Sequence, residues 1–555
     1  KRKYFRKQVK YTNYDDPSTY LGTLNANPNT RLVEERFDNH HITSNVIVDY
    51  TKSIQNHNLN AMIGYENYYF FSESVRGESE QLELSSFPYL DLANKNFLGV
   101  GGNAFENAYR SYFGRLMYNF KDKYLLQGNI RYDGSSRFAK AYRWGAFPSF
   151  SAGWVISEEP FMDNIPALSF LKFRISYGKL GNERIGNYPY QSLIQFSNAL
   201  FQEGDAITSV QTAAQQSYVI EDISWESTGV FDVGLDASFF DNKLQFTGDY
   251  YKKVTSDMLL ELEIPDFIGY DNPFQNTGKM YTTGWEVELK YRDNIGKLNY
   301  SITGNISDSK SIMGDLGGIE FLGDQVKFEG SEFNEWYGYK SDGLHQNKES
   351  VENSPLLIAN TGPGDIKYVD ISGPDGVPDG IISSAYDRVL LGGSLPRYLY
   401  GGNISLEYGA FDFSLTFQGV GKQNVKLEDR MVKPFQTGWG NFPMLLEGKY
   451  WSTYNNEQQN QSAKYPRLFY DSANNYVMSD FWLFNGSYFR MKNMSLGYTV
   501  PNKLTERYKV KNLRIYASIS DFMSINNYPK GWDPELSRNG YPITASYIIG
   551  VSVKF

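Results

Sequence analysis

The sequence predicts an all-β protein, a transmembrane antiparallel β-barrel with long loops at one end. Three observations lead to this prediction: segments of strand length that alternate apolar and polar residues, connections that alternate between short and long, and aromatic residues at the ends of the apolar rows. Alternation with a period of two places apolar side chains on one face of a sheet and polar ones on the other. Such a sheet needs an apolar medium on one side and water on the other.

The clearest alternation lies between residues 124 and 133. One face of this segment carries Tyr124, Leu126, Gly128, Ile130 and Tyr132. The other face carries Gln127, Asn129, Arg131 and Asp133, and Leu125 is the one apolar exception. Tyrosine at both ends of an apolar row is typical of a strand whose ends lie at the two membrane surfaces.

Sixteen segments of this kind are expected. They cover residues 1–11, 38–51, 57–71, 108–121, 123–134, 146–157, 168–180, 227–240, 243–262, 278–292, 297–309, 396–409, 411–424, 486–500, 511–522 and 544–555. A strand that crosses a bilayer at a tilt needs about 9–11 residues, and these segments are long enough.

The connections between these segments fall into two groups. The short ones are 52–56, 121–123, 241–243, 293–297 and 408–410. The long ones are 12–37, 72–107, 181–226, 310–395, 425–485 and 523–543. If all short turns lie on one side of a membrane, every longer connection lies on the other side. This asymmetry is typical of outer-membrane barrels, whereas a soluble β-sandwich has no reason to keep it.

Composition narrows the function classes. No apolar run reaches the 18 residues of a membrane-spanning helix, and the absence of Cys leaves no disulfide or thiolate chemistry. The net charge of −9 argues against a nucleic-acid partner. The four His, which are His40, His41, His57 and His345, fall in no metalloprotease motif, and no nucleophile-elbow motif occurs. The sequence therefore predicts no enzyme.

Several motifs carry a family resemblance. They are Arg131-Tyr-Asp-Gly-Ser-Ser-Arg-Phe138, Arg143-Trp-Gly-Ala-Phe-Pro-Ser-Phe-Ser-Ala-Gly-Trp154, Ile156-Ser-Glu-Glu-Pro-Phe-Met162, Leu171-Lys-Phe-Arg-Ile-Ser-Tyr-Gly178, Gly364-Asp-Ile-Lys-Tyr-Val-Asp370, Pro396-Arg-Tyr-Leu-Tyr-Gly-Gly402 and Trp532-Asp-Pro-Glu-Leu536. In this order they closely resemble the SusC/RagA-like TonB-dependent transporters of the Bacteroidetes outer membrane.

The resemblance implies a plugged barrel of about 22 strands, of which this chain would supply the 16 C-terminal ones. Residues 1–555 would then form one barrel portion, without the plug, the first strands or the segment that contacts TonB. The absence of an initiating Met and of a signal peptide agrees with that expectation. The implied function is import of glycans or peptides from outside the cell, with a SusD-like lipoprotein as lid and outer-membrane lipid around the barrel. The edge strands, near 1–11 and 544–555, are expected to pair with an upstream segment.

An oxygen-rich stretch, residues 370–379, is a candidate calcium site. Asp370, Ser372, Asp375 and Asp379 could converge on one ion, because Ca²⁺ takes six to eight oxygen ligands. The stretch departs from the family's usual D-x-N-G-D-G pattern, with Ser372 in place of Asn and an added Pro374. The alternative is an ordinary turn with solvated carboxylates.

Aromatic residues of the long loops are candidate substrate contacts. They are Trp336, Tyr337, Tyr339, Trp439 and Phe442. Aromatic faces stack on sugar rings and also anchor protein partners, while packing between loops is the plain alternative. Two rival functions stay open: an outer-membrane or secreted hydrolase, which cleavage of labelled glycans or peptides would reveal, and a secreted binding or adhesion protein, which would be soluble without detergent.

Overall fold

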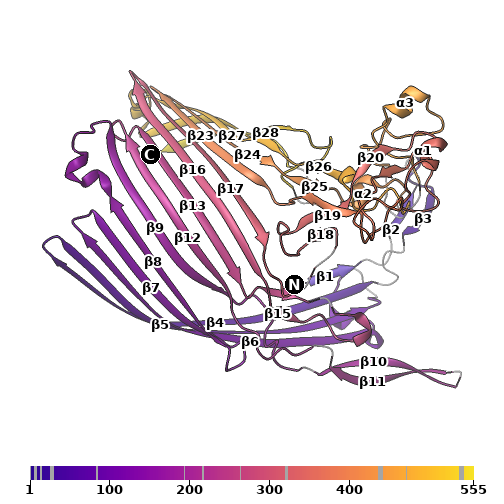
Figure 1. Cartoon of the computed structure of the whole chain (residues 1–555). Helices are drawn as coiled ribbons and strands as arrows, with labels where there is room; N and C mark the ends of the chain where they lie inside the picture. Colours follow the sequence, from indigo (N-terminus) through magenta and orange to yellow (C-terminus); the bar gives the residue numbers. More distant parts are fainter. Residues whose placement is uncertain are drawn as a thin grey trace.

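The computed structural model describes most of the chain (Figure 1). The described residues are 2–5, 9–12, 15–24, 30–82, 86–192, 194–204, 206–215, 218–262, 264–318, 320, 323–435, 442–469, 472–536 and 543–555. Trp439 lies outside them.

Sixteen strands form one continuous antiparallel sheet, in which each strand pairs with the next sheet strand along the chain. In order they are β1 (Arg2–Phe5), β4 (Arg31–Ile54), β5 (His57–Glu80), β6 (Leu98–Phe120), β7 (Tyr124–Ser135), β8 (Trp144–Val155), β9 (Leu168–Asn182), β12 (Glu226–Phe239), β13 (Leu244–Ser256), β16 (Lys279–Ile295), β17 (Leu298–Met313), β23 (Arg397–Tyr408), β24 (Phe411–Lys422), β27 (Tyr488–Val500), β28 (Asn512–Asn526) and β29 (Ser546–Lys554). Each predicted segment overlaps one of these strands, so the prediction of sixteen is confirmed.

Three strands are much longer than predicted. β4, β5 and β6 have 24, 24 and 23 residues, so they extend into the predicted loops 12–37 and 72–107. Their register continues without a break from Ile54 opposite His57 to Arg31 opposite Glu80. The upper parts of these strands lack the regular alternation of apolar and polar residues, which is typical of loops in a sequence, but antiparallel pairing with an adjacent strand still continues along them. In the opposite direction, β1 ends at Phe5 and β13 ends at Ser256, short of the predicted 11 and 262.

The sheet curves into a trough that remains open along one side (Figure 1). Within the described residues, β1 pairs only with β4 and β29 only with β28. Short turns join the strands at one end, and several have residues in the left-handed region, such as Lys121 and Asp122. Pro501 immediately precedes a short helix in the connection to β28. In the part of the chain that is described, no helix is long and apolar enough to cross a membrane.

The smaller elements lie in the connections at the other end. The strands are β2 (Val9–Thr12), β3 (Tyr20–Leu24), β10 (Ile194–Glu203), β11 (Ala206–Gln215), β14 (Leu259–Glu261), β15 (Phe274–Asn276), β18 (Gln325–Val326), β19 (Glu335–Tyr339), β20 (Ser341–Leu344), β21 (Ile366–Tyr368), β22 (Arg388–Gly392), β25 (Asn424–Lys426) and β26 (Leu483–Asn485). The α-helices are α1 (Lys348–Glu352), α2 (Asp429–Val432), α3 (Glu457–Gln461) and α4 (Asn502–Thr505). The 3-10 turns are η1 (Leu90–Leu92), η2 (Lys95–Phe97), η3 (Ile156–Glu158), η4 (Pro160–Met162), η5 (Asp266–Ile268), η6 (Asp480–Trp482) and η7 (Glu506–Tyr508).

The largest buried core lies in these connections and not in the sheet. Its buried members are Tyr339, Ile366, Tyr368, Ile382, Leu427, Met431, Val432 and Trp482. We call this region the loop assembly. It consists of the described residues within 323–392 and 424–485. It lies at one end of the trough, where Figure 1 places α1, α2, α3, β20 and β26.

Candidate functional site: the inner face and the loop assembly

The two faces of the sheet differ as the alternation predicts. One cross-strand row consists of Tyr112, Tyr132 and their apolar neighbours, and these side chains are exposed because no protein covers this outer face. The row of the opposite face joins Gln127 to Ser151, Ser151 to Ser176 and Ser176 to Asp232. This polar face is the concave, inner face of the trough.

Ion pairs between strands cross the inner face. The Arg174 guanidinium of β9 donates to Asp236 at 2.8 Å and contacts Asp249 at 3.0 Å, so it links β9, β12 and β13. Arg131 of β7 likewise pairs with Asp133 at 2.8 Å and with Glu66 of β5 at 3.2 Å. These pairs fix charged groups along the wall of an aqueous interior, where they can contact a polar solute or polypeptide.

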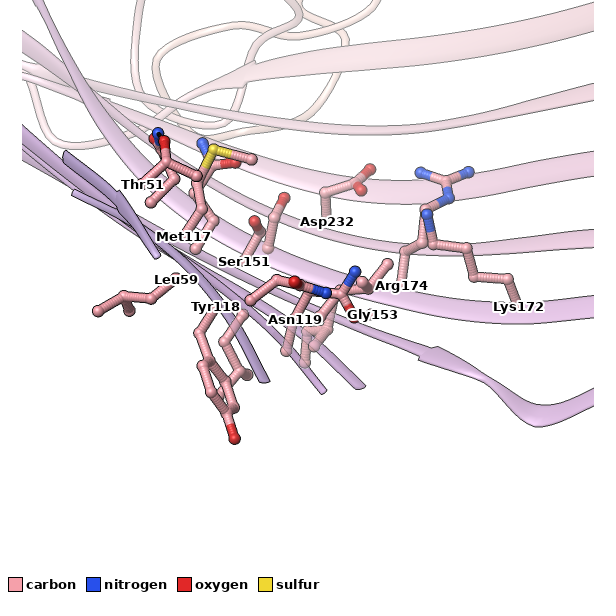
Figure 2. Close-up of a pocket in the computed structure, with 18 residues that line it drawn as sticks. Thr51, Leu59, Met117, Tyr118, Asn119, Ser151, Gly153, Lys172, Arg174 and Asp232 are labelled. Atoms are coloured by element: carbon pink, nitrogen blue, oxygen red, sulfur yellow. Dashed lines mark hydrogen bonds between the residues drawn. The ribbon is translucent and has the colours of Figure 1, made fainter. Parts of the chain in front are cut away.

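A hollow of about 450 Å³ lies along this face. Arg174 of β9 and Asp232 of β12 lie above the sheet in this view, whereas Leu59 of β5 and Tyr118 of β6 point below it (Figure 2). Most of its lining surface is apolar and includes Met117 and Leu125, while Gln127, Ser151 and Arg174 add polar groups.

The loop assembly is rigidly built around a buried carboxylate. Asp365 accepts bonds from the Arg467 guanidinium at 2.7 and 2.8 Å and from the Asn475 amide at 2.8 Å. Trp482 donates its indole N–H to the Asn475 carbonyl at 2.7 Å, and the Tyr368 hydroxyl donates to the Asn474 carbonyl at 2.7 Å. These bonds join the connection that follows β17 to the one that follows β24. Burial raises the pKa of Tyr368 far above its usual range, so this hydroxyl stays protonated.

A second network fixes the connection after β28 to the wall. The buried Arg490 guanidinium of β27 pairs with Asp533 at 2.6 Å and with Glu535 at 2.8 Å. Glu535 also accepts a bond from the Gln418 amide at 2.7 Å. The motif Trp532–Leu536 is thereby held against the inner face.

The predicted aromatic contacts have unequal exposure. Trp336 and Tyr339 are only 3% and 7% exposed, and the Trp336 indole N–H donates to the Asn424 carbonyl. The Arg388 guanidinium covers the Tyr337 ring at 4.4 Å, and Phe442 is 42% exposed beside Tyr450. Phe442 is the most exposed of these aromatic residues, whereas Trp336 and Tyr339 serve packing between loops and Arg388 covers the Tyr337 ring in this conformation. Contact of any of them with a substrate stays a prediction.

The oxygen-rich stretch forms a turn with internal bonds. Asp370 accepts from the Gly380 N–H at 2.6 Å, and Asp379 accepts from the Ile381 N–H at 2.9 Å. Asp387, which lies beneath the turn, accepts three backbone N–H bonds. Its burial would raise the pKa, but these bonds outweigh that effect and lower it.

No group of three His, Asp or Glu within the described residues is placed to hold a metal. Ser372 bonds the neighbouring Gly373 carbonyl and Asp375 is exposed to solvent. Binding of calcium by Asp370, Ser372, Asp375 and Asp379 stays a prediction, and calcium titration with proteolysis of residues 365–388 would test it.

His345 lies in the loop assembly, where a histidine could in principle serve catalysis. Its Nδ1 lies 3.2 Å from the Ser350 hydroxyl, but the residue is only 1% exposed. The nearby Asp365 carboxylate is occupied by Arg467 and Asn475, so it does not orient the imidazole. The arrangement is a buried packing contact without access for a substrate.

Comparison with known proteins gives consistent matches. A family model described as "TonB dependent receptor-like, beta-barrel" matches residues 3–520. The chain is 29% identical, over 99% of its length, to TonB-dependent receptor P26 of Formosa agariphila, and 27% identical, over 93% of its length, to TonB-dependent receptor SusC of Bacteroides thetaiotaomicron. These alignments cover 56% and 50% of the two relatives, so the chain spans about half their length.

A solved structure agrees in fold. The structure of the RagAB peptide transporter matches 96% of the chain with a TM-score of 0.81 at 23% identity, and the match covers 57% of that structure's chain. The resemblance to SusC/RagA-like transporters that the motifs predict is therefore confirmed.

Proposed function

Because the chain belongs to the TonB-dependent receptor-like β-barrel family and to the bacterial outer membrane, we propose that it forms most of the wall of a nutrient importer. The imported molecules are glycans or peptides taken from outside the cell. They are captured near the loop assembly and pass along the polar inner face. Import is driven through TonB, since no phosphate-binding motif in this sequence could use a nucleotide.

One observation supports this proposal most directly. The sixteen-stranded wall is apolar outside and polar inside, and all of its long connections gather at the end that carries the loop assembly. A wall with this polarity separates lipid from an aqueous passage. A soluble binding protein would gain nothing from the exposed apolar outer face, which in water is an aggregation hazard.

The open edges of the trough support the proposal that further strands complete the wall. Unpaired N–H and C=O groups along β1 and β29 are not tolerated in lipid, because nothing there can replace their hydrogen bonds. We propose that further strands close these edges to the roughly 22 strands of the family, around a plug that faces the inner row of Gln127 and Ser151. Cross-linking of Cys introduced on β29 to strands outside residues 1–555 would test the closure.

The proposed partners are a SusD-like lipoprotein over the mouth and TonB on the periplasmic side. The similarity to SusC supports the lipoprotein partner, and so does the position of the loop assembly at one open end of the trough. Purification of the complex from outer membranes, followed by mass spectrometry, should reveal both a co-purifying lipoprotein and a bound ligand. A preparation that contains neither, at native stoichiometry, would contradict the lid.

Uptake measurements test the function itself. Deletion of the gene should abolish accumulation of a labelled glycan or peptide, and glycan-fed and peptide-fed cultures distinguish the two classes. We further propose no catalytic role for the chain. The hydrolase would be supported instead if the purified protein released cleavage products and a variant of a surface His or Ser did not.

A further inference from the structure

Two lysines lie on the outer face of the wall, where apolar side chains predominate. Lys179 of β9 follows Phe173, Ile175 and Tyr177 in the outward row, and it lies opposite Gly229 of β12. Lys252 of β13 lies opposite Phe231, the next outward residue of β12. Both lysines are exposed, and they stand on either side of one strand.

Neither lysine has an ion-pair partner within 4.0 Å among the described residues. Another cation of this face does have a partner: Lys310 pairs with Glu332 at 2.9 Å. The contrast matters because an unpaired charge on a lipid-facing surface is costly unless it reaches an anionic group. Lys179 and Lys252 therefore need an anion that the described part of the chain does not supply.

The strand between the two lysines leaves room for such an anion. Gly229 has no side chain, and a Cβ built there would lie 3.3 Å from the Tyr177 hydroxyl. The hydroxyl therefore lies over Gly229, directly beside Lys179, and Lys252 is two residues away from the residue of β13 that lies opposite Gly229. No hydrogen bond to a described residue engages this hydroxyl, and Lys179 and Lys252 rise from the two strands that flank Gly229.

The height of Lys179 matches a membrane surface, and Lys252 lies slightly lower, level with Tyr177. Lys179 lies eleven residues above Leu168, the start of β9, and eleven residues of a strand tilted by about 45° rise by roughly 25 Å. That is about the height of the apolar band of an outer-membrane barrel. The neighbours of the two lysines, Tyr177, Phe231 and Tyr250, are the aromatic type found at this boundary.

We propose that Lys179, Lys252 and the Tyr177 hydroxyl bind the phosphate of an anionic lipid headgroup in the outer leaflet. Phosphate oxygens satisfy compact ammonium groups and accept from the phenol, while the acyl chains lie on the apolar row below. The proposal rests on the membrane placement of the wall and not on nutrient import, so an uptake defect is neither expected nor needed.

The test uses the protein purified from outer membranes and placed in lipid nanodiscs. Binding of phosphatidylglycerol, with phosphatidylcholine as the uncharged comparison, is measured by native mass spectrometry. Each unpaired lysine at a membrane surface is worth about fivefold in affinity, so Lys179→Gln with Lys252→Gln should weaken binding roughly 25-fold. Tyr177→Phe should weaken it by a smaller factor, since one neutral donor is lost.

Matched controls come from the opposite face of the same sheet. Lys253, the next residue of β13, lies over the Tyr251 ring at 4.9 Å on the inner face, and Lys290 also belongs to the inner row of β16. Lys253→Gln with Lys290→Gln removes the same charge and should leave binding unchanged. Heat-dependent migration on a gel confirms that each variant is folded.

Three results would overturn the proposal. Equal binding of phosphatidylglycerol by the Lys179/Lys252 variant and the wild type would show that these lysines do not form the site. An equal loss in the Lys253/Lys290 control would show that only net charge matters. Competition by inorganic phosphate, together with no preference for phosphatidylglycerol over phosphatidylcholine, would assign the site to free phosphate and not to lipid.

Discussion

The wall and the loop assembly are stabilised in different ways. The wall has almost no buried core: its large apolar side chains, such as Ile130 at 56% exposure, face outward. The loop assembly buries its apolar residues and its charges as a small globular domain does, around Trp482 and Asp365. Residues that count as exposed in the wall are therefore buried by lipid, whereas those of the loop assembly are buried by protein.

This difference predicts where substitutions are most damaging. In the loop assembly, stability depends on packing and on satisfied polar groups. In the wall it depends on the ladder hydrogen bonds and on which face a side chain joins. Substitutions in the two regions should therefore reduce stability by different amounts. The largest loss is expected in the core of the loop assembly, and the smallest is expected from mild acidification.

Trp482→Ala should have the largest effect. The ring is 2% exposed and packs against Tyr465, Tyr476 and Phe481, with centroids 5.9, 5.6 and 5.1 Å away. Its removal leaves a cavity and an unpaired Asn475 carbonyl, so we expect a loss of about 3–5 kcal/mol in the stability of the loop assembly. Limited proteolysis should then cut between residues 323 and 485, while the wall keeps its heat-dependent gel migration. Unfolding of both regions together would contradict their independence.

Ile130→Lys should destabilise the wall by about 2–4 kcal/mol, because it places a charge on the lipid face. The neighbouring Asn129→Lys places the same charge on the inner face and should cost much less. Urea-dependent folding into vesicles measures both. Equal costs for the two variants would show that the outer face does not contact lipid.

Asp365→Asn should destabilise the loop assembly by about 2–3 kcal/mol. The change leaves the Arg467 guanidinium without its counter-charge, although the partial exposure of Arg467 limits the penalty. The control is Asp342→Ala, which removes the exposed partner of Lys367 and should cost less than about 1 kcal/mol. Tryptophan fluorescence during thermal unfolding reports both, since Trp451 and Trp482 lie in this region.

Acidification should have the smallest effect, and it should act on the loop assembly. Burial lowers the pKa of His345, so the unfolded chain takes up a proton more readily than the folded one. Stability is therefore complete above the usual histidine pKa of about 6.5 and falls as the pH drops through and below it, by at most about 1.4 kcal/mol per pH unit. His345→Gln should flatten this dependence between pH 7 and 5. The lowered pKa of Asp387 adds a separate loss only below about pH 4.

The sequence alone determined the positions and the order of the sixteen strands, and which face of each is apolar. Alternation decides these features locally, because a residue's face depends only on its place in the strand. For the same reason, the adjacent residues Lys252 and Lys253 must point to opposite faces of one strand. The family motifs could also be recognised from the sequence alone, since they lie in strands and turns.

Only the tertiary structure decided the rest. The extension of β4, β5 and β6 depends on neighbouring strands that keep supplying hydrogen bonds after the apolar pattern ends. The burial of Trp336 and Tyr339 depends on contacts with residues far along the chain, such as Asn424 and Tyr368. Long loops meet in space without a periodic signal, so their packing is fixed by non-local contacts that no local pattern encodes.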